Sequence, residues 1–300
     1  MRIFVIGASG QLGTALCQEL STEGVEHTTA DRHELDITRA EAVKDAVSHA
    51  SPTWVVNCAA YTNVERAESE RDLAFLVNDC AVGNVADAAL SIAARVIHIS
   101  TDYVFSGHFP DAPPRPYTES DVPAPLNVYG ASKLAGERRL LDHDVSATIL
   151  RTSWLYGTPR QEGRSTSSFL EAMLRLGAER TRRGKPLRVV ADQHGTPTDC
   201  RSLARQIVAL IRSDDSQALE GIVHASCKGE TTWYEFATKI FRQCGWNLDV
   251  EPISSAEYPT KAPRPMHSVL ENRRLIDAGL ERMPCWQDGL AETLRQRGGS

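Results

Sequence analysis

The feature that most constrains the fold is a glycine-rich turn that directly follows a short apolar run at the N-terminus. Residues 3–6 are Ile-Phe-Val-Ile, and three glycines follow in a GxxGxxG spacing. Glycine lets a backbone turn tightly and approach a pyrophosphate, and the N–H groups that begin the next helix favour its negative charge. The motif therefore predicts a strand, a turn and a helix that bind a dinucleotide. We expect contacts to this cofactor from Gly7, Gly10, Gln11, Leu12 and Gly13.

The first half of the chain alternates short β-rich apolar runs with longer amphipathic segments, a pattern typical of βαβ units and a parallel sheet. Candidate strands are residues 3–6, 27–30, 54–57, 95–99 and 147–151, and candidate helices are residues 11–20, 39–50, 74–94 and 129–141. This order predicts an α/β fold with a Rossmann-type, doubly wound parallel sheet over residues 1–155.

After residue 155 the alternation weakens into candidate helices near residues 169–176, 203–211 and 232–244. A loop-rich tail is expected after them, punctuated by Pro252, Pro259, Pro263 and Pro265. We expect residues 156–300 to form a smaller α/β substrate domain, either separate from the first domain or exchanging elements with it. Four prolines between residues 110 and 116 predict an irregular surface loop, and loops of this kind often lie over sites.

Composition narrows the class of protein. With 41% hydrophobic and 24% charged residues the chain is an ordinary globular protein, and its net charge of −6 offers no basic field for nucleic acid or an acidic membrane. The seven cysteines are scattered without a CxxC pair, which argues against a disulfide framework or a zinc site. No stretch approaches the roughly 20 apolar residues of a membrane-spanning helix. We therefore expect a soluble, cytoplasmic protein that binds neither nucleic acid nor membrane.

Two further segments are expected to meet the cofactor. Asp31 ends the second candidate strand, where an acid commonly receives the ribose hydroxyls of NAD, while Arg32 could hold the 2′-phosphate of NADP. The pair predicts that NADPH and NADH are both accepted, and the alternative is a solvated Asp-Arg turn. The expected flanking contacts are Asp36 and Ile37 near the adenine and Ala59, Ala60, Tyr61 and Thr62 after the third strand.

Tyr129 and Lys133 stand four residues apart, which on a helix places a phenol and an ammonium on one face. A nearby cation favours the phenolate and would bring the tyrosine pKa down from about 10 toward the working range. Thr101 follows the fourth candidate strand at the carboxyl edge of the sheet, within reach of a substrate oxygen. The alternatives are a surface Tyr-Lys pair and a helix cap at Thr101.

Together these motifs resemble the extended short-chain dehydrogenases/reductases, and further segments resemble the dTDP-4-dehydrorhamnose reductase family over nearly the whole chain. The marks of that family are the glycine motif and residues 57–68, 100–105, 125–130, 151–154 and 192–198, with Arg264-Pro265 before Ser268 and Leu270. The last three of these marks lie outside the general dinucleotide machinery, which makes the match more specific than a shared fold.

The resemblance implies reduction of the C4 keto group of dTDP-4-dehydro-β-L-rhamnose to dTDP-L-rhamnose, with hydride from the nicotinamide and a proton from Tyr129. Lys133 would hold the nicotinamide ribose, and Thr101 would polarise the carbonyl. The implied lining of the sugar pocket is Val64, Glu65, Thr101, Asp102 and Trp154, although Trp154 could instead be a core aromatic.

Some members of this family form dimers through Mg²⁺ held by acidic side chains, one of them two residues after the third glycine. That position is Ala15 here, so a bridging ion is doubtful and the chain is expected to be a monomer or a homodimer. Other possibilities are a sugar-nucleotide epimerase, a different 4-ketoreductase, or a non-catalytic NADP-binding regulatory subunit. A dehydratase fits less well, because Tyr103 stands where the second carboxylate of a dehydratase would be.

Overall fold

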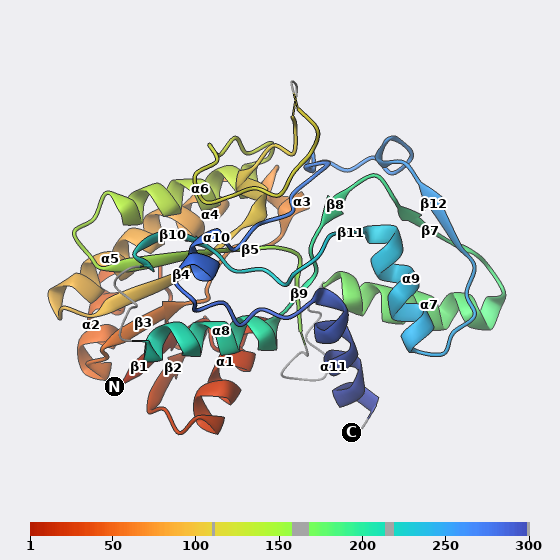
Figure 1. Cartoon of the computed structure of the whole chain (residues 1–300). Helices are drawn as coiled ribbons and strands as arrows, with labels where there is room; N and C mark the ends of the chain where they lie inside the picture. Colours follow the sequence, from red (N-terminus) through yellow and green to blue (C-terminus); the bar gives the residue numbers. More distant parts are fainter. Residues whose placement is uncertain (110–111, 158–167, 214–218, 299–300) are drawn as a thin grey trace.

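A six-stranded parallel sheet forms the centre of the computed structural model, which describes residues 1–109, 112–157, 168–213 and 219–298 (Figure 1). The strand order is β10-β5-β4-β3-β1-β2, and every neighbouring pair is parallel. The strands are β1 (Ile3–Ile6), β2 (His27–Ala30), β3 (Trp54–Asn57), β4 (Arg95–Thr101), β5 (Ala147–Thr152) and β10 (Gly221–His224). The predicted α/β fold with a doubly wound parallel sheet is confirmed.

Helices cover both faces of this sheet, as its continuous apolar strands require. On one face lie α1 (Gln11–Thr22) and α8 (Cys200–Arg212), and on the other lie α2 (Ala40–Ala50), α5 (Ala81–Ser91) and α6 (Val128–Leu141) (Figure 1). Successive residues of β1 alternate between two separate cores, with Ile3 and Val5 packed toward α1 and α8. The sheet is therefore the middle layer of three.

The chain reverses its winding between β1 and β3. After β2 the chain crosses back, so that β3, β4, β5 and β10 follow one another on the far side of β1. In open α/β sheets ligands bind at this switch point, outside the carboxyl ends of the strands. Gly7 and Cys58 leave the sheet at this edge.

The predicted helix 74–94 is interrupted. It consists of α4 (Arg71–Phe75), a π-helical turn η1 (Leu76–Cys80) and α5. Within the described residues this stretch, Arg71–Ser91, is the one helix long and apolar enough to cross a membrane by length and composition alone. Half of its most apolar 18-residue window is buried inside the fold.

The rest of the chain forms a smaller assembly beside the sheet (Figure 1). It contains three two-stranded pairings: β7 (Leu187–Val190) with β12 (Val250–Ile253), β8 (His194–Gly195) with β11 (Thr231–Thr232), and β6 (Leu155–Tyr156) with β9 (Thr198–Asp199). Its helices are α7 (Phe169–Arg183), α9 (Trp233–Gln243) and α11 (Trp286–Gly298), whereas α10 (Arg273–Asp277) packs against β10 of the sheet (Figure 1).

Two expectations about the tail were wrong. Pro252 lies within β12, which tolerates a residue without an N–H because β12 pairs on one side only. Residues 286–298 form a helix where a loop-rich tail was predicted. β10 comes from beyond residue 155 yet completes the first sheet, and α8, also from beyond residue 155, packs on one face of that sheet. The chain therefore crosses between the two parts, and the division at residue 155 stays a prediction.

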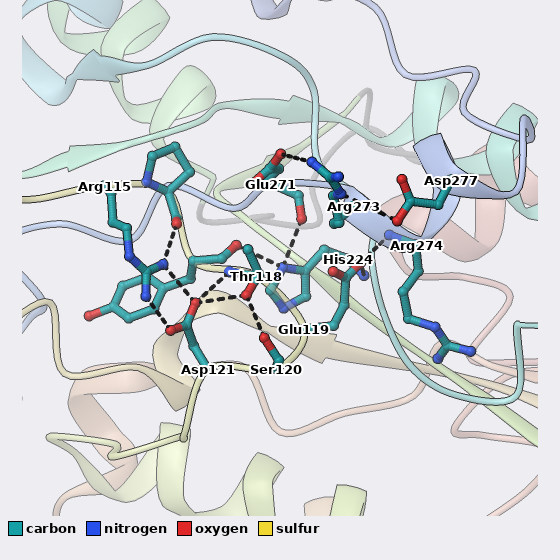
Figure 2. Close-up of polar contacts among 12 residues, drawn as sticks. Arg115, Thr118, Glu119, Ser120, Asp121, His224, Glu271, Arg273, Arg274 and Asp277 are labelled. Atoms are coloured by element: carbon teal, nitrogen blue, oxygen red, sulfur yellow. Dashed lines mark hydrogen bonds and ion pairs between the residues drawn. The ribbon is translucent and has the colours of Figure 1, made fainter.

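The proline-rich loop after Phe105 is held by polar contacts to the C-terminal part (Figure 2). Arg115 forms two hydrogen bonds, of 2.8 and 2.5 Å, with the carboxylate of Asp121. One oxygen of Glu119 accepts from the backbone N–H groups of His224 at 3.0 Å and Arg274 at 3.1 Å. The loop is irregular, as predicted, but anchored to β10 and α10; its residues 110 and 111 lie outside the described part.

Candidate active site

The glycine turn between β1 and α1 is shaped by contacts that only glycine permits. Gly7 has φ of +80°, and a Cβ there would lie 2.8 Å from the backbone nitrogen of Ala59. A Cβ on Gly13 would lie 2.3 Å from the Gly7 carbonyl oxygen. No described side chain caps α1, and its first turn has no acidic residue. The uncapped N–H groups and the missing Cβ atoms fit a pyrophosphate at this turn.

Asp31 lies beside this turn. The carbonyl of Ala30 accepts hydrogen bonds from Gly7 N at 2.8 Å and Ala8 N at 3.2 Å, which joins the end of β2 to the glycine loop. The Asp31 carboxylate accepts from His33 N at 2.8 Å, and Arg32 is exposed. Both side chains are therefore placed at the rim of the predicted cofactor site.

Asp36 and Ile37 have local roles in the structure. The Asp36 carboxylate accepts from the hydroxyl of Thr38 at 2.7 Å, and this bond lowers the pKa of Asp36. Ile37 is buried in the core on the α2 and α5 face, and its carbonyl accepts from Asn84 at 2.9 Å. Their contact with the adenine stays a prediction.

The segment Ala59–Thr62 leaves β3 next to the glycine turn. Asn57 accepts from Ala59 N at 3.1 Å, and Asn78 accepts from Tyr61 N at 2.8 Å and donates to Tyr61 O at 3.0 Å. Asn78 comes from the π-helical turn, a feature that often marks functional sites. The π turn thus fixes the backbone that was predicted to pass the cofactor.

Tyr129 and Lys133 lie in the first two turns of α6, whose N-cap is Asn127. The third residue of the helix, Gly130, packs against the turn η2 (Asp102–Val104): a Cβ on Gly130 would lie 2.1 Å from the carbonyl oxygen of Tyr103. Tyr129, next to Gly130, lies close enough to Thr101 for the threonine hydroxyl to act to lower the pKa of the phenol. The structure therefore joins two of the predicted catalytic side chains from segments 28 residues apart.

The electrostatics differ from the expectation. Burial raises the pKa of Tyr129 to about 12, and the hydrogen bond with Thr101 only partly opposes it. Lys133 is 2% exposed, and burial lowers its pKa to about 8. Its amine donates to Ile99 O at 2.5 Å and meets His98 Nε2 at 3.1 Å. In this structure burial outweighs any stabilisation of the phenolate by Lys133.

Asp102 is a buried carboxylate at the centre of the site. Its oxygens accept from Thr101 Oγ1 at 3.2 Å and Ser153 Oγ at 3.1 Å, and Ser268 also bonds to it. Burial raises the pKa of Asp102 to about 6. The structure gives Asp102 protein partners on three segments, so its direct contact with substrate stays a prediction.

Val64 and Glu65 begin the short helix α3 (Val64–Ala67). Glu65 forms an ion pair with Arg264 at 3.0 Å and accepts from Lys261 N at 2.9 Å. Burial alone would raise the pKa of Glu65, but these partners outweigh it and lower the pKa. In the sequence, Arg264 is only part of the family resemblance and has no assigned role. Its position at the site follows from the contact with Glu65, 199 residues away in the sequence.

Trp154 follows β5 with φ of +45° and reaches the smaller assembly. Its ring stacks on Trp233 with centroids 3.4 Å apart, and a Cβ on Gly195 would overlap the Trp154 ring at 2.3 Å. Since Ser153 bonds to Asp102, Trp154 is held next to the predicted catalytic residues. It is both an inter-segment contact and a candidate wall of the pocket.

The described residues contain no group of three or more His, Cys, Asp or Glu side chains that could hold a metal ion. Ala15, where some relatives of the resembled family have an acid, is a partly buried residue of α1.

Comparisons with known proteins agree with this geometry. A family model described as the RmlD substrate binding domain matches residues 1–298. The dTDP-4-dehydrorhamnose reductase of Sinorhizobium fredii is 39% identical and covers 96% of this chain and 95% of its own. The dTDP-4-keto-6-deoxy-D-glucose reductase of Streptomyces niveus is 38% identical, covering 97% and 96%.

A solved structure gives the same result. The dTDP-4-dehydrorhamnose reductase of Bacillus anthracis, in complex with NADP, is 39% identical to this chain with a TM-score of 0.89. The match covers 98% of this chain and 99% of that one.

Proposed function

The chain belongs to the dTDP-4-dehydrorhamnose reductase family, described by the RmlD substrate binding domain, and on that premise we propose that it reduces dTDP-4-dehydro-β-L-rhamnose at C4 to dTDP-L-rhamnose. The observation that carries the proposal is the junction of Thr101 and Tyr129 one helical turn from Lys133. A glycine turn that fits a pyrophosphate lies at the same edge of the sheet.

The enzyme takes NADPH or NADH, and the bound dihydronicotinamide supplies the hydride. The glycine turn and the N-terminus of α1 would hold the pyrophosphate, Asp31 and Arg32 the adenine ribose, and Lys133 the nicotinamide ribose. The residues Asp36, Ile37 and Ala59–Thr62 complete the proposed cofactor contacts.

Tyr129 would act as the general acid. Its raised pKa keeps the phenol protonated at neutral pH, so that its Oη can donate a proton to the C4 oxygen of the substrate. The hydroxyl of Thr101 donates its one proton to Asp102 in this structure, and it would turn from Asp102 to donate to the same C4 oxygen. The hydride and this proton together convert the ketone into an alcohol.

The sugar nucleotide would lie between α3 and the smaller assembly. Glu65 and Val64 would line one side and Trp154 the other. Arg264 supports this placement because its Nε is a buried donor with no partner among the described residues, so a substrate oxygen could accept from it.

The decisive experiment follows the absorbance of NADPH, and then of NADH, with purified protein and dTDP-4-dehydro-β-L-rhamnose generated in situ. Rapid oxidation with dTDP-L-rhamnose as the product is expected, and the two rates rank the cofactors. Cofactor binding without oxidation would contradict the proposal.

A second candidate is reduction of a different dTDP-4-keto-6-deoxysugar, favoured by the similarity to the Streptomyces niveus enzyme. Pocket contacts that separate such epimeric substrates amount to a few kcal/mol, so the two readings share one site. Supplying dTDP-4-keto-6-deoxy-D-glucose without the epimerase that precedes the reductase separates them. Turnover of this ketone at a kcat/KM equal to or above that of the rhamnose precursor would favour the second candidate.

The remaining expectations concern the binding partner, the oligomeric state and the cellular compartment. The partner is a dTDP-sugar, and we infer that the enzyme works in the cytoplasm as a monomer or homodimer, without nucleic acid or membrane. Sedimentation with EDTA and with Mg²⁺ tests the oligomeric state: an assembly that dissociates on chelation would contradict the expectation drawn from Ala15.

A further inference from the structure

A chain of hydrogen bonds connects Lys133 to the turn after β3 through the middle of the sheet. His98 Nε2 lies 3.1 Å from Lys133 Nζ, and His98 Nδ1 lies 3.2 Å from Asn57 Nδ2. Asn57 Oδ1 accepts from Ala59 N at 3.1 Å. Asn57 and His98 are in register on β3 and β4, so that both side chains leave the same face of the sheet, toward α6. His98 is fully buried and Asn57 is 1% exposed.

The direction of this chain is fixed at one end. A backbone N–H can only donate, so the bond from Ala59 requires the oxygen of the Asn57 amide on its side. The NH₂ group of Asn57 then donates to His98 Nδ1, which must be the bare nitrogen. Burial is the largest cause that lowers the pKa of His98 well below its ordinary value, so the ring is neutral whether or not Lys133 is charged. A neutral ring with bare Nδ1 carries its proton on Nε2.

The Nε2–H group of His98 therefore points at Lys133 Nζ. An ammonium has three donors and no lone pair, whereas a neutral amine can accept from His98 and donate to Ile99 O at 2.5 Å. For Lys133 to be charged, His98 must move its proton to Nδ1, and the Asn57 amide must turn over and lose its bond to Ala59. The hydrogen-bond direction thus works against the ammonium.

We propose that His98 and Asn57 are positioning residues that set the protonation state of Lys133 and tie it to the cofactor-facing turn at Ala59. Gly7 touches the same turn, since a Cβ on Gly7 would lie 2.8 Å from Ala59 N. We call the chain of hydrogen bonds through Lys133, His98, Asn57 and Ala59 the relay. It runs from the turn next to Gly7 to α6, the helix that carries Tyr129. Its importance for turnover rests on the function proposed above; its geometry does not.

Other groups also face Lys133. Glu137, one turn further along α6, and Cys58, after β3, both act to raise its pKa, against the lowering by burial. Glu137 is itself paired with Arg151 at 2.6 Å, which reduces its pull on Lys133. Burial lowers the pKa of Lys133 to about 8. If the relay lowers it further, by about one unit, half of Lys133 is neutral at about pH 7.

The first test reads the tautomer of His98 from the ring ¹⁵N shifts of the full chain labelled at histidine, with His98→Phe to assign the signal. We expect bare Nδ1 and protonated Nε2. His224 is an internal reference for the opposite tautomer, because its Nδ1 faces two carbonyls, Tyr117 O and Glu271 O, both at 3.1 Å (Figure 2). A protonated Nδ1 on His98 would overturn the proposal.

The second test inverts the relay with Asn57→Asp. A carboxylate still accepts from Ala59 N but cannot donate, so His98 must protonate Nδ1 and accept from Lys133 through Nε2. The Lys133 pKa, followed by its ¹³Cε shift in lysine-labelled protein, should rise by about one unit or more. The double variant Asn57→Asp/His98→Phe keeps the added charge without the relay and should lose most of this rise.

The outcomes separate the relay from a general charge effect. An unchanged Lys133 pKa in Asn57→Asp, or an equal rise in the double variant, would overturn the proposal. Neither measurement requires substrate or turnover. The relay proposal can therefore be refuted while the proposed reductase activity is confirmed, and the reductase activity can be refuted while the relay is confirmed.

Discussion

The contact between Gly130 and the turn η2 sets the distance between the two hydroxyls of the site, and Gly130→Ala should therefore impair catalysis severely. The new Cβ would lie 2.1 Å from Tyr103 O. An ordinary carbon–oxygen contact needs about 3.3 Å, so the start of α6 must move by about 1 Å. A misplacement of that size costs on the order of 100-fold in rate, equivalent to about 2.7 kcal/mol of activation free energy.

The assay compares kcat/KM for the keto-sugar nucleotide and the dissociation constant of NADPH in Gly130→Ala and wild type. Cofactor affinity should fall much less than turnover, because the glycine turn lies on other elements and only Lys133 of the proposed cofactor contacts shares the second turn of α6. Gly83→Ala is the matched control: it lies inside α5, and its Cβ would meet only the flexible side chain of Arg139, at 2.7 Å from Cδ. Gly130→Ala with turnover within threefold of the control would refute the reasoning.

Three further outcomes follow from the site. Tyr129→Phe should lose at least about 100-fold in turnover while retaining cofactor binding, and near-normal turnover would remove Tyr129 as the acid. Because burial raises the pKa of Asp102 to about 6, the folded state holds a proton that the unfolded chain releases, and stability should fall as pH rises from about 4 to about 6. Urea unfolding should show a fall of about 3 kcal/mol in wild type relative to Asp102→Asn, and parallel pH curves would contradict it. Arg151→Met, which strands the buried Glu137 carboxylate, should cost about 3 to 5 kcal/mol in urea unfolding, and adding Glu137→Leu should restore most of it; equal stability of the single and double variants would contradict this.

Patterns that are local in the sequence predicted much of this structure. The five strands expected in the first half agree with β1 to β5 to within two residues. For the inner strands the reason is that parallel strands buried on both faces are rich in apolar residues; β2 is a half-exposed edge strand of polar and small residues. The glycine turn was equally visible, since its spacing reflects a backbone path that a Cβ would block. Strand order then placed Thr101 at the ligand-binding edge.

Features that depend on distant partners could not be predicted from the sequence. The ion pair between Glu65 and Arg264 spans 199 residues and has no local pattern. The expected lowering of the Tyr129 pKa considered the cation at i+4 but not burial, which the sequence does not show and which dominates. The relay through His98 was hidden for the same reason: a lone histidine in an apolar strand carries no sign of its neighbours.

The segment of residues 263–270 explains how such distant parts share one site. Pro263 O accepts from Asn127 at the cap of α6 at 2.9 Å, Met266 O accepts from His194 N at 2.8 Å, and Val269 O accepts from Tyr117 N at 2.8 Å. One extended segment therefore bonds to the catalytic helix, to β8 of the smaller assembly and to the proline-rich loop. A rigid rotation of the smaller assembly away from the sheet would have to break the bond of this segment to β8 or, if the segment moved with the assembly, its bonds to the catalytic helix and the loop. Because Ser268 of this segment also interacts with Asp102, a motion that carried the segment along would disturb the partner of Thr101, which couples the substrate side of the site to its chemistry.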